Sequence, residues 1–197
     1  RGEALMKKEE LLTKLRLGTT VQFDLPEEPV KGIVYKNVAE QFIEISKTVG
    51  GKVIEAKPDD DLNAIIQLAF PDAKVLASNV EGITADKNPD TVADASELNG
   101  VDVGIVRGDF GVAENGCIWV PQTMKERAIC FISEELVILV DRSKLVNNMH
   151  QAYKMVEMNH YGYGVFISGP SKTADIEQAL VMGAQAAHGL TVILIDK

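Results

Sequence analysis

The sequence predicts an α/β fold: a three-layer sandwich around a mixed, largely parallel sheet. Short apolar runs such as residues 136–140 and 191–195 alternate with segments whose apolar residues keep helical spacing. Strands that alternate with helices form largely parallel sheets covered on both faces. Two short strand-to-strand connections, which follow residues 101–106 and 128–132, predict that the sheet is mixed rather than purely parallel.

The first part of the chain differs from the rest. Residues 3–17 are predicted to form a charged amphipathic helix with its leucines on one side. Residues 18–36 contain two prolines, show no sustained periodicity and are predicted to be a linker. We therefore expect an N-terminal helix and linker over residues 1–36 and a single α/β domain over residues 37–197.

The domain is expected to open with a capped helix. Asn37, followed three residues later by Glu40, resembles a capping box, and Gly50-Gly51 stops the helical spacing. Further helices are expected at 59–70, at 145–156 and after Ser171 through Gly183. Strands are expected at 52–55, 74–77, 101–106, 117–120, 128–132, 136–140, 165–167 and 191–195. The close spacing of 128–132 and 136–140 predicts an antiparallel pair.

Composition limits the partners and the location that we expect for the protein. A net charge of −9 and a pI near 4.9 argue against a nucleic-acid backbone or an anionic membrane as the main partner. We expect no membrane span, because no apolar run approaches roughly 18 residues, and no signal peptide is recognised. The two cysteines, Cys117 and Cys130, are expected to be buried and reduced, which favours a cytoplasmic location.

One polar motif follows a predicted strand end. Val165–Ile167 runs into the turn Ser168-Gly169-Pro170-Ser171, and four polar residues come next: Lys172, Thr173, Asp175 and Glu177. At the carboxyl end of a parallel strand such residues would meet a ligand. Two interpretations stay open: a helix N-terminus that holds an anion with help from Lys172, or a helix start capped by its own hydroxyls and acids.

A second candidate lies in the glycine-rich stretch 108–116. It brings the carboxylates of Asp109 and Glu114 to strand ends, with Asn115 and Gly116 beside them. Glu114 could act as a base, a nucleophile or a hydroxyl acceptor. The alternative is a β-connection whose acids only face water. No metal site and no cofactor is expected, since the three histidines and two cysteines show no ligand spacing.

These segments resemble a known family. The stretch from Val165 to Gly183, with its Ser-Gly-Pro-Ser-Lys-Thr-Ala-Asp-Ile-Glu sequence, is similar to the strongest motif of the LUD-domain lactate-utilisation family, LutC/YkgG-type subunit. The resemblance extends to Gly111–Gly116 and, more loosely, to the helix around Phe42. Two departures occur: Glu114-Asn-Gly-Cys117 stands for the usual Glu-Thr-Gly-Thr, and Gln185-Ala-Ala187 for the usual His-Gly-Pro.

The resemblance implies both a fold and a role. It implies a fold similar to the NagB/RpiA/CoA-transferase group with a ligand pocket at strand carboxyl ends. It also implies a part in the oxidation of L-lactate to pyruvate, alongside iron–sulfur partner subunits. The chain itself carries no cysteine cluster for such a centre.

Three hypotheses follow. In the first, the chain is a non-redox subunit of a lactate-oxidising complex that binds a small carboxylate or hydroxylated ligand. In the second, it catalyses CoA-transferase-like acyl transfer, because Ala113-Glu-Asn-Gly116 is similar to the Ser-Glu-Asn-Gly motif of those enzymes, with Glu114 as nucleophile and Asn115 as oxyanion donor. In the third, it is a regulatory module that binds a small metabolite.

Overall fold

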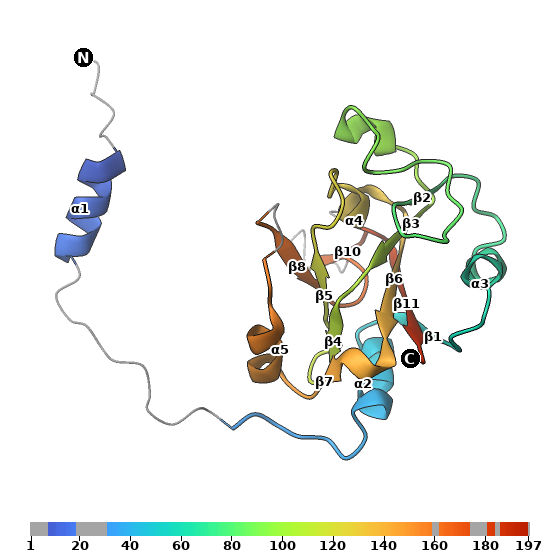
Figure 1. Ribbon diagram of the computed structural model, residues 1–197, viewed down its shortest axis with the longest axis horizontal. Helices are drawn as coiled ribbons and strands as arrows, with labels where there is room; N and C mark the ends of the chain where they lie inside the picture. Colours follow the sequence, from blue (N-terminus) through green and yellow to red (C-terminus); the bar gives the residue numbers. More distant parts are fainter. Residues whose placement is uncertain (1–7, 19–30, 159–161, 174–180, 184–185, 197) are drawn as a thin grey trace. The chain divides into compact units, whose positions relative to one another are not determined.

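The computed structural model describes residues 8–18, 31–158, 162–173, 181–183 and 186–196 (Figure 1). The chain forms two compact units, Arg1–Lys31 and Gly32–Lys197. The first unit contains helix α1 (Lys8–Gly18), which has no buried residue and confirms the predicted N-terminal helix over its described part. Within the described residues, no helix combines the length and apolar character that a membrane crossing requires.

A five-stranded parallel sheet forms the centre of the second unit. Its strands, in spatial order, are β1 (Lys52–Ala56), β11 (Gly189–Ile195), β6 (Glu135–Asp141), β3 (Val103–Arg107) and β2 (Leu76–Ser78). All four pairings are parallel. The α/β fold with a largely parallel sheet is therefore confirmed.

The antiparallel pairings belong to a separate sheet. It orders β7 (Leu145–Val146), β4 (Phe110–Val112), β5 (Ile118–Pro121) and β8 (Gly164–Ile167). Strand β5 is antiparallel to both of its neighbours, whereas β4 and β7 are parallel. The short strands β9 (Lys172–Thr173) and β10 (Val181–Met182) form an antiparallel pair.

Helices lie on both sides of these sheets (Figure 1). They are α2 (Val38–Thr48), α3 (Leu62–Ala69), α4 (Ile129–Ile132) and α5 (Met149–Met155), with short 3₁₀ turns at Ala95–Leu98 and Arg142–Lys144. Helix α3 packs on one face of the parallel sheet, and α2, α4 and the second sheet share the core on its other face. Helix α5 packs on the outer face of the second sheet.

The alternating direction of side chains along the central strands explains why the sheet has a core on each face. In β6, Leu136, Ile138 and Val140 enter the core with α2, whereas Val137 and Leu139 enter the core with α3. Because successive side chains of a strand point to opposite faces, a strand buried on both sides must be apolar throughout. The largest side chain of α2 at this core is Phe42, which is fully buried.

The main helices begin at capping side chains. The Asn37 carboxamide oxygen accepts a hydrogen bond from the Glu40 N–H at 3.2 Å, which confirms the predicted N-cap. Asp61 caps α3 in the same way, accepting from the N–H groups of Asn63 and Ala64. Such caps satisfy backbone donors that have no partner inside the helix.

Two predicted elements are wrong. The strand predicted over 128–132 is instead helix α4 (Ile129–Ile132), with the Ile132 N–H bonded to the Ala128 carbonyl at 2.8 Å. The predicted antiparallel pair therefore does not exist, and β6 instead lies between β11 and β3. A short apolar run cannot be assigned to helix or strand from periodicity alone.

The helix predicted after Ser171 is also wrong where the structure describes it. Lys172–Thr173 forms β9 and pairs with Val181–Met182. Residues 174–180 lie outside the described residues. The helix predicted over 145–156 is shorter, because β7 occupies its first residues and α5 begins at Met149.

We predict that Phe42→Ala destabilises the second unit by about 3–5 kcal/mol, because it removes a fully buried ring and leaves a cavity. Urea unfolding followed by circular dichroism measures the change. Leu68→Ala is the matched control, since that side chain is 84% exposed, and its effect should stay within about 0.5 kcal/mol. Equal effects of the two substitutions would contradict the packing described here.

Candidate functional site

The two loops singled out in the sequence meet in the structure. The Ser168 hydroxyl, at the end of β8, donates a hydrogen bond to the Asn115 carbonyl at 2.8 Å. The pairing of β8 with β5 brings them together, because Ile167 is the partner of Ile118 in the sheet. Residues 53 positions apart in the chain thus form one junction.

Both loops pack against the end of α2. Gly116 has a φ of +68°, and a methyl group there would lie 3.3 Å from the Ser46 backbone. Gly169 has a φ of +65°, and a methyl group there would lie 2.5 Å from the Val49 carbonyl oxygen. Glycine serves both needs, since it adopts positive φ readily and lets another backbone approach closely.

A lysine closes the junction. The Lys172 ammonium donates a hydrogen bond to the Val49 carbonyl, immediately after α2. The last carbonyls of a helix lack partners within the helix and carry partial negative charge. A cation is therefore favourable at this position, and it ties the Ser168–Lys172 loop to α2.

Glu114 is held at the start of α5. Its Oε2 accepts a hydrogen bond from the Met149 N–H at 2.9 Å, and the side chain is otherwise exposed. A carboxylate at a helix N-terminus is stabilised by the free N–H groups there. The neighbouring Asn115 side chain accepts from the Cys117 N–H at 3.2 Å, as in an Asx turn. These contacts give both side chains a structural role in the turn.

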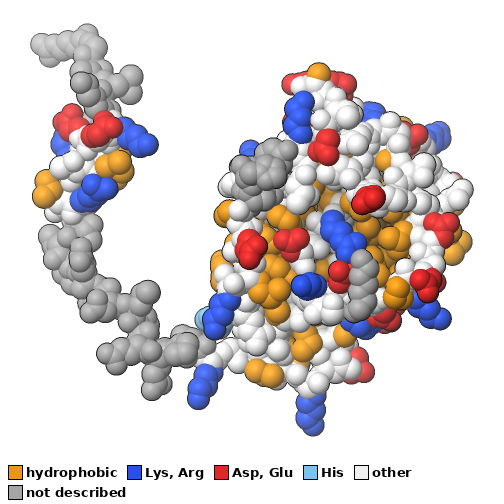
Figure 2. Space-filling model, viewed as in Figure 1, with side chains coloured by type: hydrophobic (Ala, Val, Ile, Leu, Met, Phe, Trp, Pro, Cys, Tyr) orange, Lys and Arg blue, Asp and Glu red, His pale blue; other side chains and the backbone are white. Residues whose placement is uncertain are grey.

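A cavity of about 270 Å³ lies beside the junction. Its mouth includes Ser168, Ser171 and Lys172. Its apolar walls come from α4, β8 and the first residues of β6 and β11: Cys130, Phe131, Leu136, Val165, Ile167 and Leu190. Hydrophobic side chains are also exposed elsewhere on the second unit, across the middle of the face seen in Figure 2. The site is therefore a mainly apolar hollow with a polar rim.

The cavity corrects the position expected from the sequence. Strand β8 belongs to the second sheet, and its carboxyl end lies at the amino ends of β6 and β11, where Leu136 and Leu190 line the cavity. The Ser168 turn therefore follows the carboxyl end of a strand, as expected, but that strand does not belong to the parallel sheet. The sequence shows a strand followed by a turn, but it does not show which sheet the strand joins.

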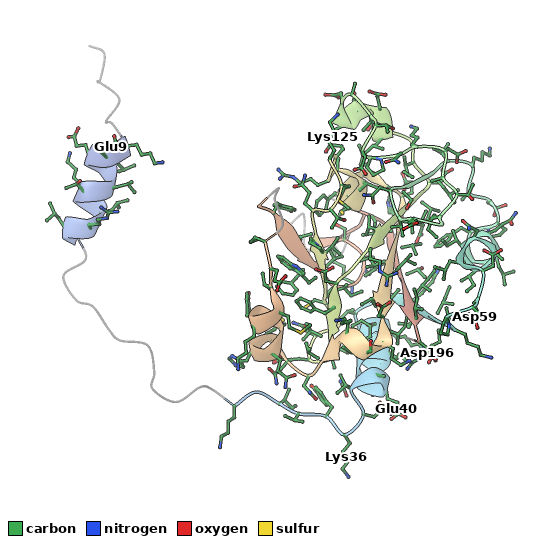
Figure 3. The ribbon with its side chains drawn as sticks, viewed as in Figure 1. Glu9, Lys36, Glu40, Asp59, Lys125 and Asp196 are labelled. Carbon is green, nitrogen blue, oxygen red and sulfur yellow. The ribbon has the colours of Figure 1, made fainter. Side chains whose placement is uncertain are left out.

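The carboxyl edge of the parallel sheet is occupied by ion pairs instead. Arg107 bonds to Asp141, and Arg142 bridges Glu55 and Asp196. Figure 3 labels Asp196 at this edge, just after β11. These pairs tie the ends of β1, β3, β6 and β11 together.

Asp109 belongs to that opposite edge. It precedes β4, whereas Glu114 follows the strand, so the two carboxylates lie at different ends of β4. Burial raises the pKa of Asp109, with the negative charge of Glu157 as a further cause, and Arg107 and Lys144 oppose the rise. Asp109 is therefore not part of the junction.

The remaining predicted residues divide in two groups. Asn115, Gly116, Ser168, Gly169, Ser171 and Lys172 are brought together at the junction or the cavity. The Thr173 side chain, Asp175 and Glu177 lie outside the described residues. Sequence reasoning missed Val49 and the apolar walls. The glycine pair Gly50-Gly51 after α2 is the one sign in the sequence of a close approach here, although it predicts only the end of a helix.

Both cysteines are buried as free thiols in different parts of the core. Burial raises the pKa of Cys117 to about 11 and that of Cys130, which lines the cavity, to about 12. A thiolate is the reactive form, so neither thiol is activated. Among the residues described, no group of three or more His, Cys, Asp or Glu could hold a metal ion.

We predict that Gly169→Ala destabilises the second unit more than Gly82→Ala. Both glycines have positive φ, at +65° and +81°, so both variants incur about 1–2 kcal/mol of backbone strain. Only Gly169 also faces Val49, because nothing lies within 4 Å of a methyl group at Gly82. The clash should add about 1–3 kcal/mol. Urea unfolding measures the difference, and equal losses would show that the loop does not press on α2.

We also predict a loss of stability at alkaline pH that depends on the thiols. A cysteine in the unfolded chain has a pKa of about 8.5. Below that pH the thiols are protonated in both the folded and the unfolded state, so the folded state keeps its full stability. As pH rises toward the raised folded pKa values, unfolding becomes favoured by up to about 1.4 kcal/mol per pH unit for each thiol. Cys130→Ala should therefore show a shallower decline of unfolding free energy than the native chain. Parallel declines would contradict the burial of Cys130.

Comparison with known proteins places the chain in a family. Lactate utilization protein C of Exiguobacterium sp. is 29% identical over 191 residues, covering 86% of this chain and 82% of that protein. The protein of the same name from Bacillus subtilis is 28% identical over 163 residues, covering 78% and 66%. The chain matches about half of the length of several other curated relatives.

A solved structure and a family profile complete the comparison. The crystal structure of a DUF162 family protein from Deinococcus radiodurans shares the fold, with a TM-score of 0.62 at 14% identity, covering 83% of this chain and 99% of that one. The profile of the LUD domain matches residues 93–195, which is just over half of the chain and includes the junction residues Asn115 and Ser168. The predicted resemblance is confirmed, and the chain belongs to the LUD domain family.

Proposed function

We propose that this chain takes part in lactate utilisation as a non-redox subunit of a complex that oxidises L-lactate to pyruvate. Membership of the LUD domain family supports the proposal, as does the name lactate utilization protein C carried by similar proteins from Exiguobacterium and Bacillus subtilis. Residues 37–197 would form the domain that carries this role.

The proposed ligand site is the junction beside the cavity. The observation that carries it is the Ser168–Asn115 hydrogen bond, which unites the two polar motifs. The rim offers the hydroxyl of Ser171, the ammonium of Lys172 and the Ser168 oxygen, which can still accept a hydrogen bond. An ammonium has three N–H donors, and the Val49 carbonyl takes one of them. A small carboxylate or hydroxylated ligand matches these groups.

The proposal assigns electron transfer to partner subunits. Oxidation of lactate to pyruvate removes two electrons and two protons. The chain contains two cysteines, fewer than the four ligands of a common iron–sulfur cluster, and their side chains lie in different parts of the core. We therefore propose iron–sulfur subunits as the electron acceptors and as the partners of this chain.

Acyl transfer is less well supported. The Glu114 carboxylate, which would be the nucleophile, is bound to the Met149 N–H at the start of α5. Asn115, which would stabilise the oxyanion, accepts a hydrogen bond within its own turn. Both contacts have a structural explanation, so we do not propose that reaction.

Growth on lactate tests the proposed function. Deletion of the gene should abolish growth on lactate, and the native chain should restore it and recover iron–sulfur proteins in a pull-down. Lys172→Met should fail to restore growth, because it removes the rim cation. Lys125→Met is the control. Like Lys172, Lys125 donates a hydrogen bond to a main-chain carbonyl, that of Val92, but it does not line the cavity (Figure 3). Normal growth after deletion, with no iron–sulfur partner recovered, would refute the proposal.

A further inference from the structure

The cavity beside the junction is larger and more apolar than lactate requires. Lactate offers a single methyl group as its apolar part. The cavity is partly open to solvent and measures about 270 Å³, and an enclosed apolar cavity of about 150 Å³ holds a benzene molecule. An isobutyl or phenyl group therefore fits where a methyl group leaves most of the wall uncovered.

The walls are fixed by the core of the protein. Leu136 and Leu190 are 2% and 3% exposed, and Cys130 is 4% exposed. Opposite them lie Val165 and Ile167, which point from β8 toward the same core. Because these positions are set by two sheets, the cavity cannot close without disturbing the strands. A ligand that leaves it empty would forgo the apolar contact that these walls offer.

Among the described residues that line the cavity, charge is confined to one end. Of the described residues that line it, Lys172 alone carries a charge, and Ser168 and Ser171 lie in the same loop. A ligand that satisfies both ends has one carboxylate, a neighbouring hydroxyl and an apolar side chain. A second carboxylate would have to enter the apolar part, which is unfavourable.

We propose that the site prefers 2-hydroxy monocarboxylates with a branched aliphatic or aromatic side chain over lactate itself. This inference rests on the proposed function, because it places the carboxylate and hydroxyl at the same Ser168–Lys172 rim. It adds the chemical class of the side chain. Each additional buried methylene strengthens binding by about fourfold. The three extra carbons of 2-hydroxyisocaproate should therefore bind about 60-fold more tightly than the methyl group of lactate.

Titration calorimetry with a graded series tests the preference. The probes are L-lactate, 2-hydroxybutyrate, 2-hydroxyisocaproate and phenyllactate, each added to the full chain. We expect the dissociation constant to fall stepwise from lactate to 2-hydroxyisocaproate, and phenyllactate to bind more tightly than lactate. A constant affinity across the series, tightest binding of lactate, or no binding of any probe would overturn the inference.

Substitutions of lining residues test whether the preference for larger side chains arises in the cavity. Ala186→Leu adds bulk to a half-buried lining residue, and it should bring 2-hydroxyisocaproate to the affinity of lactate. Ala69→Leu is the control, because Ala69 is similarly half-buried but lines hollows beside α3. Lys172→Met should weaken all four probes by a similar factor. If Ala186→Leu fails to fold, Phe131→Ala in the apolar wall should selectively weaken phenyllactate.

The two proposals can fail separately. A reversed or flat binding series, together with lost growth on lactate after deletion, would leave the proposed function standing and reject the side-chain preference. The expected series, together with normal growth on lactate after deletion, would support the site and reject its part in lactate utilisation.

Discussion

The close approach of α2 to three glycines is the constraint on which the rest of the structure depends. A methyl group at Gly111 would lie 2.9 Å from the Phe42 ring, Gly116 meets the backbone of Ser46 in the last turn, and Gly169 meets Val49 just after the helix. Without side chains at these positions, α2 can lie directly against the second sheet and the Ser168–Lys172 loop. The helix thus fixes the positions of the second sheet and of the Ser168–Lys172 loop, whose residues line the cavity.

This packing also explains where the site lies. In doubly wound α/β folds, ligands usually bind at the carboxyl ends of parallel strands. Here Arg142 joins Glu55 to Asp196 at that edge, so its charged groups already have partners. The amino edge instead receives β8 and its turn from the second sheet, which leaves a hollow between two elements of different origin. Such a hollow arises from the meeting of the two sheets.

Much of the fold could be predicted from the sequence, and less of the site. The runs 136–140 and 191–195 are continuous and apolar because their strands are buried on both faces. The run 128–132 is equally apolar, yet it forms α4, because four or five residues carry no period that separates helix from strand. Both site motifs were visible as polar turns. Their contact was not, since it depends on the pairing of β8 with β5.

The strand order has a consequence for how the protein is made. β11 is the last strand of the parallel sheet along the chain, yet it lies inside that sheet, between β1 and β6. During translation, the unpaired backbone edges of β1 and β6 must wait for a segment that leaves the ribosome after every other strand of the sheet. Long-range strand pairing of this kind forms slowly, and aggregation-prone apolar surface stays exposed until it is complete. The parallel sheet of the nascent chain is therefore expected to stay incomplete until β11 has been synthesised.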